Sequence, residues 1–333
     1  MTAPFIQTTI IGSYPVPLWL PVYPTRSHLK DAILVVLKTQ ELAGLDLISD
    51  GELGRFDINH PETNGMIDYF VKPLKGIETS LSHEERQLFR NQYGMGFRKH
   101  PSGIVRSTIS EGSLDLQSDY LAAAQATTRP VKFAVTSPYM LAKTLLNHHY
   151  HNIEELTWAI ANVLRCQIAR IEAPFVQIDE AHLPGSIDDS ALAADTINHI
   201  LEAAPHQTGV HLCFGNYGGQ TIQKGTYEKL LPFFNTLQCD FLLLEFARRN
   251  QESIELFQDL KPSLRLGIGV IDIKDLEIET PEIIARRIEH AVQKLGAERV
   301  HWIHPDCGFW MLPRTVADQK MQALVKGRDL FCQ

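Results

Sequence analysis

The 333-residue sequence lacks a long apolar run, and no stretch approaches the roughly 20 residues that a membrane-spanning helix requires. It also lacks an excess of positive charge, because 39 acidic residues outnumber 31 lysines and arginines and give a formal net charge of −8. Its start has no cationic segment ahead of an apolar one and is interrupted by Pro4, Pro15 and Pro17. We therefore expect a cytoplasmic protein without a signal peptide, a membrane partner or a nucleic-acid partner.

Cysteine is scarce, and the chain has no phosphate-binding loop. Five cysteines form an odd set without short spacings, which is typical of a reducing compartment with free or metal-bound thiols. Residues 179–182 read DEAH, as in helicases, but no GxxxxGK[ST] segment accompanies them. The sequence therefore excludes a nucleotide-driven motor.

Short apolar segments rich in β-branched residues recur along the chain, and amphipathic segments lie between most of them. The apolar segments are 8–13, 45–50, 131–136, 175–180, 210–214, 240–246, 264–270 and 299–305. The amphipathic ones include 152–172, 187–204 and 280–295, and the last begins with Thr280 as N-cap and Pro281 in the first turn.

Eight apolar strands alternating with helices predict an α/β protein with a parallel sheet, and eight strands close a TIM (β/α)8 barrel. An open, doubly wound sheet is the alternative. That fold usually has a glycine-rich first turn, whereas here the turn reads IGSYPVP (11–17). We predict the barrel, as a single domain over residues 1–333.

The segment 72–130 is polar and interrupts this alternation after the second strand. Its basic residues are Arg86, Arg90, Arg98, Lys99, His100 and Arg106. One interpretation is a solvated insertion with a helical piece. The other is a lid over the barrel mouth that contacts an anionic ligand.

Barrel enzymes carry their chemistry at the carboxyl ends of the strands. His211 and Cys213 are two residues apart on a strand, so both side chains face the same side. Glu245 ends the next strand, and Cys307 follows the last one. Taken singly, a strand histidine or a free cysteine is usually a core residue. Together these four residues predict a metal site.

Two thiolates, an imidazole and a carboxylate favour Zn2+ over magnesium or calcium. Two thiolates also make the ion a poor activator of water, but such an ion keeps a bound substrate thiol deprotonated. Alkyl transfer to a small thiol is therefore the favoured chemistry. A zinc hydrolase is the alternative from another class, and a non-catalytic zinc-holding protein is a third.

Glu52 and Asp179 form a second pair of carboxylates at predicted strand ends. One interpretation makes them helix caps or members of salt bridges. The other makes them a clamp for the ammonium group of a substrate, which two anions at one barrel mouth would attract.

These residues lie in motifs by which the chain, from Thr8 to about residue 325, resembles the catalytic C-terminal barrel of the cobalamin-independent methionine synthases. The motifs are IGSYP (11–15), DGELGRFD (50–57), QIDEAHL (177–183), HLC (211–213), LEFAR (244–248), GIGVIDIKD (267–275) and HPDCG (304–308). The resemblance implies a zinc-dependent methyltransferase that converts homocysteine to methionine.

The resemblance also implies the site residues. In the family, zinc is held at the positions of His211, Cys213, Glu245 and Cys307. The amino-acid part of homocysteine is held at the positions of Ile11, Ser13, Glu52 and Asp179. The partners it implies are therefore homocysteine and a methyl donor, whereas the sequence identifies no accessory protein.

Three departures concern the donor half of the reaction. The long synthases have an additional N-terminal barrel, for which this chain is too short. The tryptophan that stacks on the folate pterin aligns with Thr144, and the histidine that protonates folate aligns with Lys274. We take Lys274 and Asp272 as the candidate catalytic residues and expect a methyl donor other than polyglutamyl methylfolate. Alkyl transfer to another thiol, of the coenzyme M type, remains the alternative within this superfamily.

Overall fold

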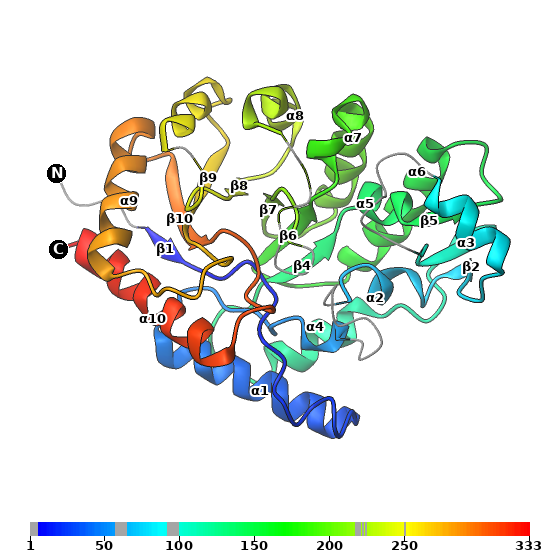
Figure 1. Ribbon diagram of the computed structural model, residues 1–333, viewed down its shortest axis with the longest axis horizontal. Helices are drawn as coiled ribbons and strands as arrows, with labels where there is room; N and C mark the ends of the chain where they lie inside the picture. Colours follow the sequence, from blue (N-terminus) through cyan, green and yellow to red (C-terminus); the bar gives the residue numbers. More distant parts are fainter. Residues whose placement is uncertain are drawn as a thin grey trace.

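The fold, as given by a computed structural model, is α/β, with a curled parallel sheet surrounded by helices (Figure 1). The structure describes residues 6–56, 65–91, 100–216, 221, 223, 225–249 and 251–333. The order of the seven strands is β1-β10-β9-β8-β7-β6-β4. Their bounds are β1 Gln7–Thr8, β4 Phe133–Thr136, β6 Phe175–Glu180, β7 Gln207–Leu212, β8 Phe241–Leu244, β9 Arg265–Ile271 and β10 Val300–Pro305.

The predicted second strand, 45–50, is present only as two isolated parallel bridges. Thr9 pairs with Leu47, and Ile48 pairs with Val131, so this short segment lies between the edge strands β1 and β4. The carboxylate of Asp46 accepts hydrogen bonds from the backbone N–H of Thr8 at 2.7 Å and from its hydroxyl at 2.8 Å. The Asp46 side chain thus accepts the N–H of Thr8, which a longer second strand would have paired with a backbone carbonyl.

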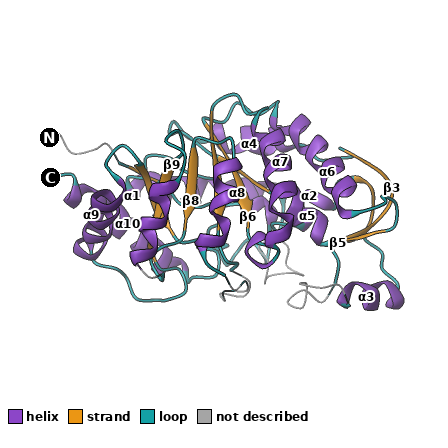
Figure 2. Cartoon of the chain, turned by 90° about the horizontal axis from the view of Figure 1, so that it is seen from above, coloured by secondary structure: helices purple, strands orange, loops and turns teal. Residues whose placement is uncertain are grey.

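The helices cover the outer face of the sheet (Figures 1 and 2). Their bounds are α1 Arg26–Ala43, α2 Asp68–Val71, α4 Leu116–Ala124, α5 Pro138–Lys143, α6 Ile153–Ile168, α7 Ser190–Leu201, α8 Leu231–Thr236, α9 Pro281–Leu295 and α10 Arg314–Phe331. Short 3-10 turns are η1 Leu53–Arg55, η2 Leu183–Gly185, η3 Ile187–Asp189, η4 Tyr227–Leu230 and η5 Gln251–Asp259. The predicted start of α9 is confirmed, because the Thr280 hydroxyl accepts the N–H of Ile283.

Large rings fill the inside of the curled sheet near the amino ends of its strands. Phe175 stacks on Phe241 with ring centroids 5.7 Å apart, and Trp302 meets both rings edge-on. A side chain at Gly209 would collide with this packing, because its Cβ would lie 2.6 Å from the Phe175 ring. This end of the interior is therefore solid core, and the polar inward residues lie toward the carboxyl ends.

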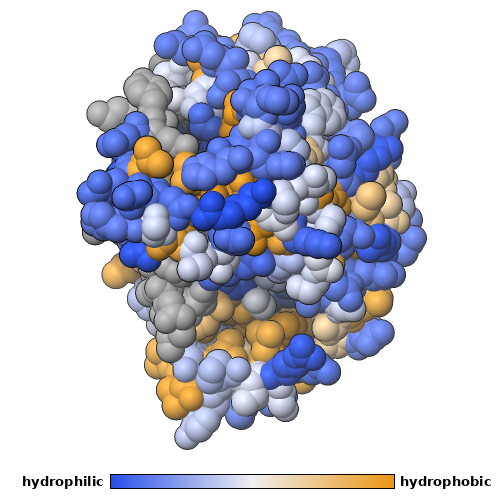
Figure 3. Space-filling model, turned by 90° about the vertical axis from the view of Figure 1, so that its right-hand side faces the viewer, coloured by the Kyte–Doolittle hydropathy of each residue, from blue (hydrophilic) through white to orange (hydrophobic). Residues whose placement is uncertain are grey.

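The segment 72–130 has its own structure. β2 Lys75–Glu78 and β3 Gly103–Ser110 form a second sheet with β5 Leu145–Asn147, accompanied by α3 His83–Arg90. Helix α4 instead packs against α1 and α6 in the outer layer. Figure 3 shows the side of the molecule that carries the second sheet, where hydrophilic side chains predominate. A lid function for this segment remains a prediction.

Two basic residues of the segment are engaged locally. Arg106 forms ion pairs with Glu78 at 2.7 Å and Glu85 at 2.6 Å, and Arg86 donates to the carbonyl of Leu81. Arg98 and Lys99 lie outside the described residues. Within the described part of the chain, no helix is long and apolar enough to cross a membrane.

Candidate metal and substrate site

Three of the four predicted metal ligands come together at the carboxyl ends of the strands. His211 lies in β7, Cys213 follows it, and Cys307 follows β10. The donor atoms of these three residues all lie within 4.8 Å of one another, and the two sulfur atoms are 3.9 Å apart. His211 and Cys213 are buried, and Cys307 is partly exposed, so the cluster opens toward the strand ends.

The histidine is oriented by the neighbouring strand. His211 pairs in register with Leu243 of β8, and its Nδ1 lies 3.0 Å from the Leu243 carbonyl, which fixes that nitrogen as the donor. The other ring nitrogen, Nε2, is buried without a hydrogen-bond partner among the described residues. A buried imidazole lone pair beside two thiols is the donor set that zinc prefers, so the residues fit this ion.

Without a cation, the close contact of the two thiols makes their ionisation unfavourable. The neighbouring sulfur of Cys307, together with burial, raises the pKa of the Cys213 thiol well above its ordinary value. Two thiols in contact cannot both ionise unless a positive charge compensates them. A bound metal ion reverses this balance, because ligating thiols lose their protons.

Glu245, the fourth predicted ligand, is not part of this three-residue cluster. Its Oε1 accepts two hydrogen bonds from Arg249, from Nε at 2.9 Å and from Nη2 at 2.7 Å. The Arg249 guanidinium also lies over the rings of Phe214, 3.5 Å from its centroid, and Tyr227. Glu245 Oε2 is buried and makes no hydrogen bond to a described residue.

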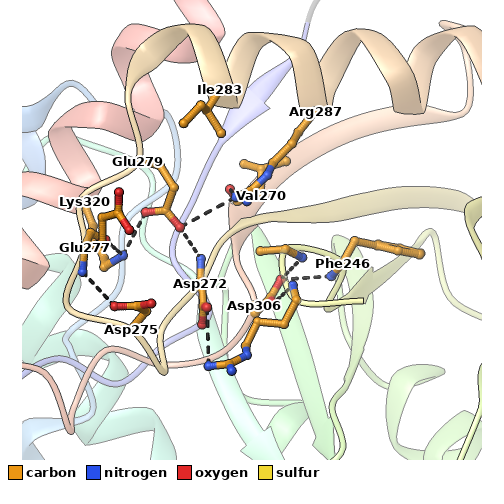
Figure 4. A network of polar contacts seen from close by, with 12 residues as sticks. Phe246, Val270, Asp272, Asp275, Glu277, Glu279, Ile283, Arg287, Asp306 and Lys320 are labelled. Atoms are coloured by element: carbon orange, nitrogen blue, oxygen red, sulfur yellow. Dashed lines mark hydrogen bonds and ion pairs between the residues drawn. The ribbon is translucent and has the colours of Figure 1, made fainter. Parts of the chain in front are cut away.

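Asp306 directly precedes Cys307 in the sequence, and its side chain is hydrogen-bonded to the loop after β8 (Figure 4). Its carboxylate accepts the backbone N–H groups of Phe246 and Ala247 at 2.9 Å and of Arg248 at 3.3 Å. Burial raises the pKa of Asp306 to about 7. The positions of Cys307 and of the loop that carries Glu245 are therefore set by one carboxylate.

Asp272, a predicted catalytic residue, belongs to the same network (Figure 4). Its Oδ1 accepts the N–H of Lys274 at 2.8 Å, and its Oδ2 lies 3.4 Å from Nη1 of Arg248. Its own N–H donates to Glu279, which pairs with the fully buried Lys320. Asp272 therefore positions its neighbours, and the network gives it a fixed place.

A cavity of 380 Å³ lies beside Glu245 and Asp272. It is lined by Thr221, Thr226, Tyr227, Glu245, Arg248, Arg249, Ser253, Leu256, Asp272, Ile273, Lys274 and Asp306. Lys274 thus lines the same cavity as Glu245, the fourth predicted ligand. Thr144 is buried, with its hydroxyl bonded to the Leu141 carbonyl at 2.7 Å, and provides no flat stacking surface.

The side chains of the predicted substrate residues Ser13 and Glu52 occupy space that is open only because two neighbouring residues are glycines. A Cβ at Gly12 would lie 2.1 Å from the Glu52 carboxylate, and a Cβ at Gly308 would lie 1.9 Å from the Ser13 hydroxyl. Glu52 itself has a left-handed backbone with φ of 55°, which a non-glycine residue adopts at some cost. Such strain is typical of functional positions.

Glu52 and Asp179 are both buried carboxylates. Burial raises the pKa of Glu52 to about 7 even though Arg55 lies 3.4 Å away. Burial likewise raises the pKa of Asp179, which pairs in register with His211 across β6 and β7. Burial therefore outweighs the effect of the neighbouring cations at both carboxyl groups.

Other strand-end residues have structural roles, and some contributors were missed from the sequence. Glu180 caps the turn after β6 by accepting the N–H groups of His182 and Leu183. Gln177 donates hydrogen bonds to Asp179 and Ile11, and Lys132 donates to Gln177, but neither residue was predicted from the sequence. The available signal was a lysine and a glutamine at inward positions of apolar runs, where a polar side chain needs a partner.

Comparisons with known proteins identify the family of this chain. The sequence model of the family described as cobalamin-independent synthase, catalytic domain, matches residues 6–328 of the chain. The methionine synthase of Thermococcus kodakarensis is 29% identical over 99% of this chain and 94% of its own length. The methionine synthase of Pyrococcus furiosus is 30% identical over 98% of this chain and 93% of its own length.

Among solved structures, a B12-independent methionine synthase from Shewanella sp. W3-18-1 in complex with selenomethionine has the same fold. Its TM-score is 0.81 at 23% identity, and the match covers 98% of this chain and 97% of that one. The similarity in sequence and in fold thus extends over nearly the whole chain, and we conclude that the chain belongs to the cobalamin-independent methionine synthase family.

Proposed function

We infer that the chain transfers a methyl group to the thiol of homocysteine and yields methionine, the activity of its family. The observation that carries this proposal is the position of two buried carboxylates: Asp179 pairs in register with His211 of the cluster, and Glu52 lies close enough to Asp179 for their charges to interact. The cluster suits the binding of a thiol, and the carboxylates suit the binding of an ammonium group. Homocysteine has both.

We propose that His211, Cys213 and Cys307 hold zinc, with Glu245 as the fourth ligand. When bound, zinc would lower the pKa of the substrate thiol and keep it as a thiolate. The protein residues then act on the rest of the substrate. Glu52 and Asp179 bind the ammonium, while Ile11 and Ser13 complete the contacts to the amino-acid part.

In the transfer itself, the sulfur forms a bond to the methyl carbon as the bond from that carbon to the donor breaks. The electron pair of the broken bond stays on the donor. A donor with a poor leaving group needs a proton at that atom, and Lys274 in the 380 Å³ cavity is the residue that we assign to this step. Asp272 positions it by accepting its backbone N–H.

We propose that the donor is not ordinary polyglutamyl methylfolate. Lys274 replaces the histidine suited to protonate a folate near neutral pH, and the buried Thr144 cannot stack on a pterin. The test incubates zinc-loaded protein and homocysteine with methylfolate, methylcobalamin or simple methylated donors separately, and measures methionine. Rapid turnover with methylfolate alone would contradict this part, and no binding of homocysteine would contradict the function.

We also propose that the sheet is a complete TIM (β/α)8 barrel in which 45–50 is the second strand. The two parallel bridges, Thr9–Leu47 and Ile48–Val131, support this because they join the edges of the sheet in the order that a barrel requires. A closed barrel brings Glu52, which follows this segment, to the same mouth as the metal cluster.

A further inference from the structure

We propose that Lys132 and Gln177 form a buried positioning pair that orients the groups binding the amino-acid part of the substrate. The inference rests on the proposed function, because it takes homocysteine as the ligand of Asp179 and Ile11. Among the described residues, the hydrogen bonds of the Lys132 and Gln177 side chains go to each other, to Asp179 and to Ile11, and none goes to a proposed metal ligand. They act through the residues that we place against the substrate.

The pair is buried in the interior of the curled sheet. Lys132 precedes β4 and is 2% exposed, and Gln177 in the middle of β6 is fully buried. Nζ of Lys132 donates to Oε1 of Gln177 at 2.7 Å. A long cationic side chain buried to this extent is rare and needs a specific partner.

This contact decides which way the Gln177 amide points. With its oxygen bound to Lys132, the amide directs both N–H groups of Nε2 to acceptors. One goes to the Asp179 carboxylate at 2.6 Å and the other to the Ile11 carbonyl at 2.9 Å. A flipped amide would place its oxygen against these two acceptors and its N–H groups against the lysine donor, so only one orientation satisfies all four groups.

One amide therefore connects two proposed substrate contacts on different strands. Asp179 lies at the end of β6, and Ile11 lies just after β1 on the other side of the sheet. Fixed acceptors bind a ligand without losing further conformational entropy, so preorganisation raises affinity. Lys132 holds both acceptors in place through a single hydrogen bond.

Lys132 also offsets charge around the site. Glu52 and Asp179 are buried near Arg55 and Lys132, whose positive charge opposes the effect of burial on the carboxyl groups, while burial in turn lowers the pKa of Lys132 to about 7. Removing one cation leaves a buried carboxylate with less compensation. Its loss would thus disturb both the orientation and the charge of the ammonium site.

The test compares Lys132→Met and Gln177→Glu with the unmodified protein, all loaded with zinc, by isothermal titration with homocysteine. Gln177→Glu keeps the shape and a partner for Lys132 but removes both N–H donors. We expect each variant to bind homocysteine about 10- to 100-fold more weakly, the range for lost hydrogen bonds to charged groups. The double variant should be little weaker than either single one, since both break one chain of contacts.

Two controls separate positioning from general damage. Lys320→Met removes another fully buried lysine, paired with Glu279 at 2.8 Å, and should leave the homocysteine dissociation constant within about twofold. The second control is 2-mercaptoethanol, a thiol without an amino-acid group. Its binding to the zinc-loaded variants, and their zinc content, should match those of the unmodified protein.

The outcomes distinguish this inference from the proposed function. If the unmodified protein fails to bind homocysteine, the proposed function is wrong. If it binds homocysteine but both variants bind equally well, or lose 2-mercaptoethanol to the same extent, the positioning role is wrong. Should Lys132→Met fail to fold, Gln177→Glu decides alone, because it retains the lysine and its partner.

Discussion

The two sides of the metal cluster are built differently. On one side, Glu52 and Asp179 are buried and held by a closed set of contacts. On the other side, Lys274 and Arg249 line an open cavity of 380 Å³. Closed contacts specify one ligand, whereas an open cavity lined by charges of both signs admits several. Under the proposed function, many fixed contacts serve recognition of the acceptor, whereas recognition of the donor depends on few residues.

One departure from the family's motifs, Lys274, lines the open cavity, whereas Thr144 lies at the end of α5, outside that lining. By the resemblance, both take the places of residues that serve folate, whereas the positions assigned to the thiol and the amino acid are retained. A change of donor is therefore compatible with an unchanged acceptor site. The predictions below test this division, beginning with the cluster that both sides share.

Cys307→Ser should have the largest effect. A hydroxyl is a poor ligand for a soft zinc site, so we expect zinc affinity to fall more than about 100-fold, beyond the range reached by outer contacts alone. Metal analysis and a competition titration with a chelator measure this. Cys332→Ser, near the C-terminus and outside the cluster, is the matched control. Full zinc occupancy in Cys307→Ser would remove Cys307 from the ligand set.

Lys274→Met should affect the donor side alone. If Lys274 supplies the proton to the departing donor, the rate of transfer should fall about 100-fold or more. The dissociation constant of homocysteine should stay the same, because Lys274 lines the cavity beside Glu245, whose lining includes neither Glu52 nor Asp179. Single-turnover kinetics and titration measure the two quantities. An unchanged rate with the natural donor would show that this reaction needs no acid at Lys274.

Glu52→Gln and Asp179→Asn should affect the acceptor side alone. Each variant removes a charge-assisted contact to the ammonium group, worth roughly 1.5–3 kcal/mol, so homocysteine should bind about 10- to 100-fold more weakly. Thiols without an amino group should bind as before. Normal binding of homocysteine to both variants would instead make these carboxylates structural.

The sequence predicted the elements that local periodicity determines. The segment 175–180 coincides with β6, and the spacing of His211 and Cys213 placed both donors on one face. It did not show that the second strand, 45–50, is reduced to two bridges, with Asp46 inside it bonded to Thr8 through its side chain. It also missed Lys132 and Gln177, because the direction of an amide depends on acceptors from distant strands.

Glu245 illustrates why a residue set is easier to predict than its geometry. Its place at the end of β8 follows from the apolar run before it. Its carboxylate is nevertheless engaged by Arg249, four residues later, which the sequence analysis did not consider. A metal ion and Arg249 compete for the negative charge of this one carboxylate. The sequence alone does not show which of the two it pairs with.

Arg249→Met should therefore change zinc affinity in the direction opposite to Cys307→Ser, and by less. Arg249 pairs with Glu245 Oε1 through two hydrogen bonds and so offsets the charge of the carboxylate, whose other oxygen, Oε2, would bind zinc. The pair is partly exposed, and we expect about 3- to 10-fold tighter zinc binding once the competing cation is gone. Arg248→Met is the matched control, because Arg248 pairs with Asp272 and should leave zinc affinity unchanged. Weaker binding in Arg249→Met would mean that the guanidinium instead holds Glu245 in the orientation that zinc requires.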